Sequence, residues 1–149
     1  MVKLSIIEHV EDVAKMKIDQ DYIKGLLEAF ENSTTGETNV NELKKLKFDY
    51  ETDIFIFHMR LLDDKKLIRQ VRDFEGFGLI IGSNGHKNWY EVALRLTVEG
   101  HDFLDAIRNK EVWSTIKIGF KDASIGTLVD VSKKLFESYI QKKINNLLE

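Results

Sequence analysis

Apolar residues recur every three or four positions through most of the first 66 residues, which is the spacing of amphipathic helices. The pattern predicts a short N-terminal helical arm over residues 1–18 and a helix that follows it and ends near Glu31. Asp19 or Asp21 can cap this second helix, because a short carboxylate accepts hydrogen bonds from the unpaired N–H groups of the first turn.

The longest helical pattern in the first half covers residues 49–66, after a short predicted helix over residues 40–46 that Asn39 caps. On a wheel of about 100° per residue, one apolar face collects Ile54, Phe57, His58, Leu61 and Leu62. The opposite side collects Asp49, Asp53, Ile56, Arg60 and Asp63. We therefore expect Ile56 to be exposed and His58 to be a hydrogen-bonded core histidine rather than a ligand.

After Lys66 the spacing of apolar residues changes from every three or four positions to every second position. The helical spacing returns at Thr97. Residues 90–96 alternate between apolar and polar, which predicts a half-buried strand, and residues 67–72 are its predicted partner. Four of the nine glycines lie within residues 74–89, so we expect a β-hairpin between the two strands.

Three helices are predicted after the hairpin. Thr97 caps the first, which reaches Arg108 and carries Gly100 on its apolar face, where a glycine allows close approach to the sheet. A short helix with Val112, Trp113 and Ile116 follows. The last helix, residues 124–148, has a wide apolar stripe made of Leu128, Leu135, Phe136, Tyr139, Ile140, Ile144 and Leu147.

Helices followed by a two-stranded hairpin are the order of a winged helix-turn-helix. We therefore predict a mainly α (α+β) protein, a winged helix-turn-helix with a long β-hairpin wing and additional C-terminal helices. The predicted domains are a helical arm at residues 1–18, a winged-helix domain at residues 19–109 and a C-terminal helical extension at residues 110–149.

Three segments carry a resemblance to known proteins. Residues 57–62 with Leu67-Ile68 are similar to a helix that ends in a His-x-x-Leu-Leu run before a Leu-Ile strand. Residues 96–108 are the most specific segment, and Val112-Trp113 follows it. Together they resemble an uncharacterised bacterial and phage family of winged-helix proteins, a domain of unknown function, and also the YjcQ-like group.

This resemblance implies a winged helix in a regulatory or phage-related setting. It implies no activity, so no functional residue is carried over from it. The chain departs from the family pattern at one turn, because Lys65-Lys66 stands where the family usually has a small residue and a glycine.

Composition narrows the classes of protein. With 149 residues, 43% of them apolar and 32% charged, the chain is typical of one globular domain with its own core. The absence of cysteine excludes a disulfide scaffold, a thiolate zinc site and a cysteine nucleophile. No apolar run approaches the ~18 residues of a membrane span, and the start lacks a signal-peptide pattern. We therefore expect a cytoplasmic protein that does not associate with a membrane.

No segment has the spacing of a catalytic or cofactor motif. The four histidines lie far apart without a His-Glu-x-x-His pattern, and the glycines of residues 74–89 fit neither a dinucleotide loop nor a P-loop. Asp63-Asp64 is interpreted as a solvated helix end. We therefore expect no enzymatic activity, no metal and no cofactor.

The charge distribution favours one basic region. The net charge is −3, yet residues 65–96 carry six Lys and Arg against three Asp and Glu. Such a patch can hold phosphates, because screening limits the effect of distant carboxylates. The candidate contacts to double-stranded DNA are Lys44, Lys45, Lys47, Arg60, Lys65, Lys66, Arg69, Arg72, His86, Lys87 and Arg95. The alternative interpretation is a solvated basic surface.

The aspartates on the polar side of the 49–66 helix oppose direct base reading by that helix, because carboxylates repel phosphates. The stripe of the last helix also has two interpretations: it packs within its own domain, or it pairs with a second copy in a homodimer. Its seven apolar residues are then the candidate dimer interface. Two functions stay open, a DNA-binding transcriptional regulator and a protein–protein interaction module that binds no DNA.

Overall fold

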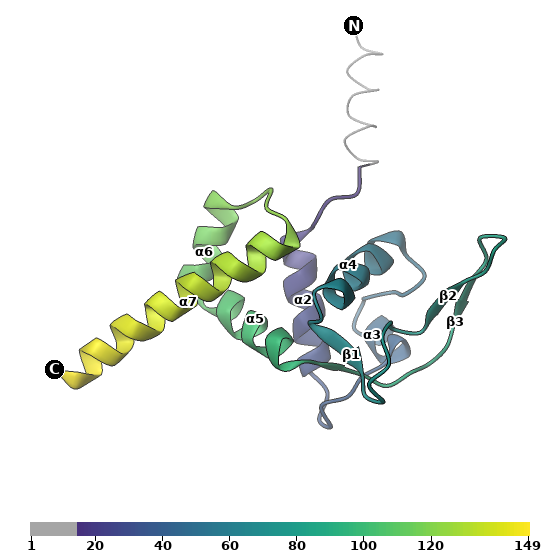
Figure 1. Ribbon diagram of the computed structural model, residues 1–149, viewed down its shortest axis with the longest axis horizontal. Helices are drawn as coiled ribbons and strands as arrows, with labels where there is room; N and C mark the ends of the chain where they lie inside the picture. Colours follow the sequence, from purple (N-terminus) through teal and green to yellow (C-terminus); the bar gives the residue numbers. More distant parts are fainter. Residues whose placement is uncertain (1–14) are drawn as a thin grey trace, which may run out of the picture.

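The computed structural model describes residues 15–149, so nearly all of the predicted arm at residues 1–18 lies outside the described residues. The elements are α2 (Gln20–Glu31), α3 (Val40–Lys45), α4 (Asp53–Asp64), β1 (Ile68–Gln70), β2 (Leu79–Ile81), β3 (Lys87–Trp89), β4 (Leu94–Leu96), α5 (Val98–Arg108), α6 (Lys110–Gly119) and α7 (Ile125–Leu148). The protein is thus α+β and mostly helical, as predicted. In Figure 1, α2 lies between α5–α7 on one side and α3, α4 and the strands on the other.

Side-chain caps fix the helix starts at the positions that the sequence indicates. The Asp19 carboxylate accepts from the Tyr22 N–H at 3.0 Å, and the Asn39 side chain accepts from the Glu42 N–H at 2.9 Å. The Thr97 hydroxyl accepts from the backbone N–H at the third position of α5 at 3.1 Å. Each bond satisfies a donor that has no partner inside its helix. The predicted starts of α2, α3 and α5 are confirmed.

Helix α4 differs from its prediction in both extent and face. It begins at Asp53, because Thr52 is the cap, with its hydroxyl accepting from the N–H at the third helical position at 3.3 Å. Its buried residues are Phe55, Ile56, His58, Met59 and Leu62. The expectation that Ile56 is exposed is wrong, since the side chain is only 4% exposed. The buried face is rotated by about a quarter turn because Phe55 also packs toward Trp89 of the hairpin, at 6.1 Å between ring centroids.

Strands β1 and β4 form an antiparallel pair between the boundaries at Lys66 and Thr97. In its register Ile68 lies opposite Leu96 and Arg69 lies opposite Arg95. Alternate side chains point to opposite faces, so Ile68, Leu94 and Leu96 are buried while the two arginines face outward. Thr38, between α2 and α3, bridges the free edge of β4 through two 2.8 Å hydrogen bonds with Leu94.

The predicted strand over residues 90–96 is shorter in the structure, where β4 begins at Leu94. The reason is an irregular segment, residues 71–78, on the opposite side of the ribbon. It contains positive φ angles at Asp73, Gly76 and Gly78, of 66°, 87° and 99°. A side chain at Gly78 would place its Cβ 2.2 Å from the Tyr90 carbonyl oxygen. The ribbon is therefore divided into the β1–β4 pair and an outer β2–β3 pair.

The outer β2–β3 hairpin projects from the body of the molecule (Figure 1). Its turn is closed by the Gly82 N–H donating to the His86 carbonyl at 2.9 Å, with Gly85 at a φ of 82°. Trp89 at its base contacts the rings of Tyr50 and Phe77, at 5.1 and 6.0 Å between centroids. Aromatic packing therefore attaches the base of the hairpin to the domain.

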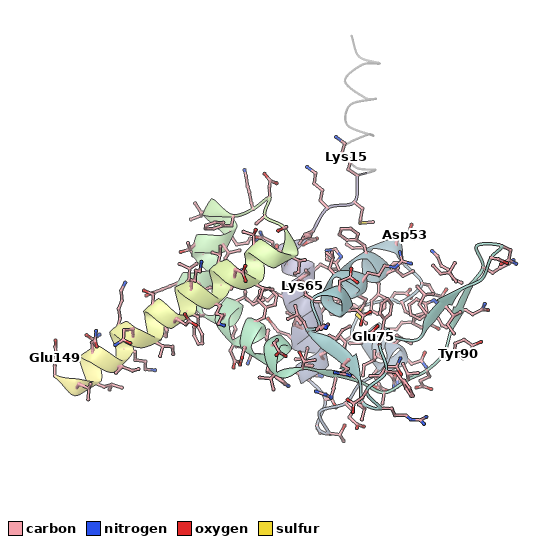
Figure 2. All side chains as sticks on the ribbon, in the orientation of Figure 1. Lys15, Asp53, Lys65, Glu75, Tyr90 and Glu149 are labelled. Carbon is pink, nitrogen blue, oxygen red and sulfur yellow. The ribbon has the colours of Figure 1, made fainter. Side chains whose placement is uncertain are left out.

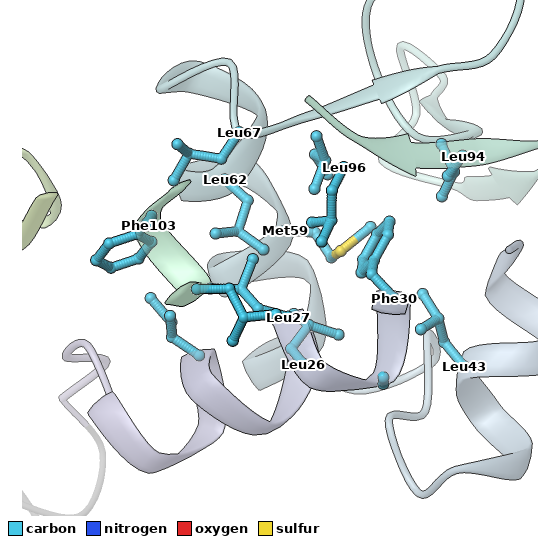
Figure 3. Close-up of a cluster of buried hydrophobic side chains, with 14 of the residues drawn as sticks. Leu26, Leu27, Phe30, Leu43, Met59, Leu62, Leu67, Leu94, Leu96 and Phe103 are labelled. Atoms are coloured by element: carbon cyan, nitrogen blue, oxygen red, sulfur yellow. The ribbon is translucent and has the colours of Figure 1, made fainter. Parts of the chain in front are cut away.

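The core is built around α2, whose buried side chains meet those of α4, α5 and the β1–β4 pair (Figure 3). Leu26, Leu27, Leu62 and Leu104 are fully buried there. Gly100 lets α5 pack closely against the backbone just before β1, because a Cβ at this position would lie 2.0 Å from the Leu67 carbonyl oxygen. The close approach predicted for this glycine is confirmed.

His58 joins the start of α2 to α4 inside the core. Its imidazole is fully buried, with Nδ1 2.7 Å from the Ile54 carbonyl oxygen, and its Nε2 accepts from the Asp19 N–H at 2.9 Å. Nδ1 must donate and Nε2 must accept, so the ring is neutral. Burial lowers the pKa of His58 from its usual 6.5. The prediction of a hydrogen-bonded core histidine is confirmed.

The turn between α4 and β1 accommodates its lysine without a glycine. Lys66 has a φ of 57°, in the left-handed region where glycine is usual. Its carbonyl accepts from the Thr97 hydroxyl at 2.7 Å, and the next carbonyl, of Leu67, accepts from the Thr97 N–H at 3.0 Å. These bonds hold the turn in the conformation that a glycine would allow freely.

Candidate nucleic-acid interface

The predicted phosphate contacts do not form one continuous surface. Five of them gather around the end of α4 and the outer face of the β1–β4 pair: Lys65, Lys66, Arg69, Arg72 and Arg95. The others lie on α3, on the exposed side of α4 and on the outer hairpin. Figure 2 shows Asp53 at the hairpin side of α4 and Lys65 at its opposite end.

Arg69 and Arg95 form the most organised pair of cations in this group. They are directly opposite each other on antiparallel strands, where two like charges repel. The Asp73 carboxylate lies between them, with its Oδ1 3.5 Å from Arg69 Nε and 3.7 Å from Arg95 Nη2. All three side chains are solvent-exposed. One carboxylate therefore offsets one of the two positive charges and lies between the two guanidinium groups.

The role of Asp73 has no signal in the sequence. Its spacing of four residues from Arg69 is a signal for an ion pair only in a helix, and this segment is not helical. Arg72, the neighbouring residue, lies instead over the Phe74 ring, at 5.8 Å from its centroid.

The cations of α3 are engaged locally. The Lys44 ammonium lies 3.1 Å from the Glu51 carboxylate, which raises the pKa of Lys44, and Lys45 lies 3.0 Å from Glu42. Lys47 follows α3 at a φ of 79° and is exposed. Lys44 and Lys45 thus pair with acidic neighbours of α3 and the loop after it.

The outer hairpin places Lys87 near α4. Lys87 of β3 lies 3.4 Å from the Asp53 carboxylate at the start of α4, and His86 is exposed at the turn. Arg60 and Asp64 are also on the exposed side of α4, and within residues 15–149 no carboxylate lies within ion-pair distance of Arg60. The exposed side of the helix thus combines two aspartates with a single arginine.

A hollow of about 270 Å³ separates the end of α4 from β1. Its lining mixes cations and carboxylates: Asp63, Asp64, Lys66, Ile68, Arg69, Glu75 and Thr97. Burial raises the pKa of Asp63 above its usual 3.8, while the Gly76 N–H, which donates to its carboxylate at 3.3 Å, acts in the opposite direction. In residues 15–149 no group of three or more His, Asp or Glu side chains is placed to hold a metal ion.

The candidate dimer residues divide between the core and the surface. Leu128 is only 3% exposed and packs within its own chain, and Leu135, Phe136 and Tyr139 are half-buried. Ile140, Ile144 and Leu147 are exposed, and Leu147 is 77% exposed. The first part of the α7 stripe therefore packs against its own domain, and the last part is exposed to solvent. No described helix has both the length and the apolarity needed to span a bilayer.

Residues 17–126 match a protein-family model described as "Hypothetical protein (DUF2513)". The chain belongs to the DUF2513 family. An uncharacterised protein of Haemophilus influenzae is 26% identical over 129 residues, which is 87% of this chain and 99% of that relative. No solved structure matches the chain. The expectation of an uncharacterised bacterial family is confirmed, while the similarity to the YjcQ-like group stays a prediction.

Proposed function

We propose that this DUF2513 protein is a winged helix-turn-helix protein that binds double-stranded DNA and acts in transcriptional regulation. The observation that carries the proposal is the order of elements: α2, a bridging residue, α3 and α4 come before an antiparallel ribbon. Thr38 pairs with Leu94 of β4 in an isolated antiparallel bridge, on the side of β4 away from β1. In a winged helix the third helix lies near the major groove and the wing contacts the DNA backbone.

The outward arginines of β1 and β4 support backbone binding. A guanidinium group donates in a planar fork that matches phosphate oxygens. A phosphate at this place would replace the Asp73 carboxylate as the partner of Arg69 and Arg95. The aspartates on the exposed side of α4 oppose close contact with base edges, so phosphate contacts supply most of the affinity in this proposal.

DNA binding is tested first through its salt dependence. We expect a labelled mixed-sequence duplex to bind the protein at low salt and to lose affinity steeply as salt rises, by about 0.9 in log affinity per log salt for each phosphate contact. Replacing both Arg69 and Arg95 with glutamine should lower that slope by roughly 1.8, the share of two contacts. The measurement is fluorescence anisotropy over a salt series, with circular dichroism to check folding.

The matched control changes Lys110 and Lys121 to glutamine. This removes the same charge from exposed positions at the start of α6 and just after it, away from the ribbon. The control should bind DNA as the unaltered protein does. If both double variants lose DNA affinity equally, binding depends on overall charge and not on Arg69 and Arg95. If the unaltered protein does not bind DNA at low salt, the DNA proposal is refuted.

Removing the carboxylate that competes with phosphate should strengthen binding. We expect Asp73→Asn to raise the affinity for the same duplex about fivefold, because two exposed ion pairs of modest strength no longer hold the arginines. Asparagine also tolerates the φ of 66° at this position. Asp122→Asn, in the turn between α6 and α7, changes the net charge equally. If the two variants bind DNA with the same affinity, the Asp73 carboxylate does not compete with phosphate for Arg69 and Arg95.

Self-association through α7 is the second candidate function. The observation that favours it is the exposed apolar end of α7, where Ile140, Ile144, Leu147 and Leu148 all face solvent. Figure 1 shows this end extending beyond the other helices. A two-fold dimer would also present two DNA-binding surfaces to one duplex.

A further inference from the structure

A groove with an apolar floor and an acidic rim lies between α5 and α7. It has a volume of about 360 Å³ and its floor contains Phe103, Ala106, Val129 and Phe136. Its rim carries five carboxylates, Glu99, Asp102, Asp105, Asp130 and Glu137, and a single cation, Lys133. None of the five takes part in an ion pair within residues 15–149. The groove therefore fits an apolar segment that brings positive charge.

The projecting end of α7 has these properties. The face of α7 that forms one wall of the groove, Val129, Lys133 and Phe136, continues at helical spacing through Ile140, Ile144 and Leu147. Lys143 lies on the same side of the helix, next to Ile144. The segment beyond Tyr139 is thus an exposed amphipathic helix with a lysine beside its apolar stripe, and it is continuous with the groove.

We propose that the groove is the docking site for the end of α7 from a second copy of this chain. The two α7 helices run antiparallel, with Ile140 near the two-fold axis, so that each copy gives its apolar end and receives that of the other. This interface is self-complementary, as a two-fold dimer requires. It deepens the self-association proposed above and does not depend on DNA binding.

The register follows from the apolar and charged positions. With Ile140 on the axis, Phe136 meets Ile144 of the second copy and Lys133 lies beside Leu147 of the second copy. Glu137 then faces Lys143 of the second copy, and symmetry repeats each contact. Because long lysine side chains cover apolar surface with their methylene stems, Lys133 can border Leu147. A shift by one residue would turn Lys143 away from Glu137.

Charge exchange tests this pairing in solution. Lys143→Glu should weaken the dimer about tenfold, because it replaces two attractive contacts with two repulsive ones. Adding Glu137→Lys in the same chain should restore the dimer to within about threefold, since the contacts become attractive again. Sedimentation velocity over a concentration series measures both. Lys142→Glu is the matched control, because Lys142 points to the opposite side of α7, toward α6.

Cysteine cross-linking tests the direction of the helices, since the natural chain contains no cysteine. Ile140→Cys should form a disulfide-linked dimer under mild oxidation, because the two copies of this residue meet at the axis. Leu147→Cys alone should not, whereas a mixture of Lys133→Cys and Leu147→Cys chains should cross-link to each other. A parallel pair of helices would instead link Leu147→Cys to itself.

Three results would overturn the proposal: a monomer at all concentrations, self-linking of Leu147→Cys, or failure of Glu137→Lys to rescue Lys143→Glu. A monomer that binds a basic amphipathic peptide in the groove would assign the site to another protein. Loss of DNA binding with the dimer intact would affect only the DNA proposal, so the two proposals fail separately.

Discussion

Gly100→Ala is expected to lower the free energy of unfolding by about 3 kcal/mol, at the upper end of what overpacking costs in a protein core. The added methyl would lie 2.0 Å from the Leu67 carbonyl oxygen, a distance that no relaxation of a side chain can relieve because the contact is with backbone. Either α5 moves away from the ribbon or the turn before β1 changes. Urea unfolding followed by circular dichroism measures the loss.

Gly126→Ala is the matched control for this substitution. It adds the same methyl group in the first turn of α7, where the nearest atom is 4.0 Å away. Because alanine restricts the unfolded chain and favours helix, the control should raise the free energy of unfolding by about 0.5 kcal/mol. Equal effects in the two variants would show that crowding at Leu67 is not the cause.

His58→Phe is expected to cost about 2 kcal/mol at neutral pH and to remove part of the acid sensitivity of the protein. A planar aromatic ring is kept, although phenyl is larger than imidazole, and the Asp19 N–H loses its acceptor at the start of α2. In the natural protein burial lowers the pKa of His58, so the unfolded chain takes up a proton near pH 6.5 before the folded protein does. Stability from the neutral ring is therefore complete above pH 6.5 and is lost as the pH falls below that value toward the folded pKa.

The measurement is the free energy of unfolding of both proteins from pH 7.5 to pH 5, by urea titration. The gap between the natural protein and His58→Phe should narrow as the pH falls, because only the natural protein loses the contribution of a neutral imidazole. Carboxylates titrate equally in both proteins and cancel in the comparison. A gap that stays constant across this range would contradict the assigned protonation of His58.

Features that depend on a few neighbouring residues were predictable from the sequence. Asp19, Asn39 and Thr97 cap helices where the pattern places them, because a cap uses only the donors two or three residues later. The core position of His58 and the close approach at Gly100 also follow from their place on an apolar helix face. The change in apolar spacing at Lys66 and Thr97 correctly predicts where the β1–β4 pair lies, because that spacing is also a local property of the sequence.

Features that depend on the packing of distant elements were not predictable. Ile56 is buried because α4 packs against other elements on more than one side. A helical wheel that assumes one buried face cannot show this. The strand over residues 90–96 is shortened by irregular backbone on the opposite segment, at Asp73 and Gly78. The pairing of Arg69 with Arg95 requires the strand register, and the acidic groove requires the placement of α5 beside α7.

The bridge between Thr38 and Leu94 has a consequence for the order of folding. The segment between these two residues contains α3, α4, β1, β2 and β3, so their hydrogen bonds close a long loop. The entropy of closure is smaller when the enclosed chain has already shortened into helices and a hairpin. We therefore expect the local elements to form before the bridge, which Leu94 closes through its backbone N–H and C=O, both bonded to Thr38.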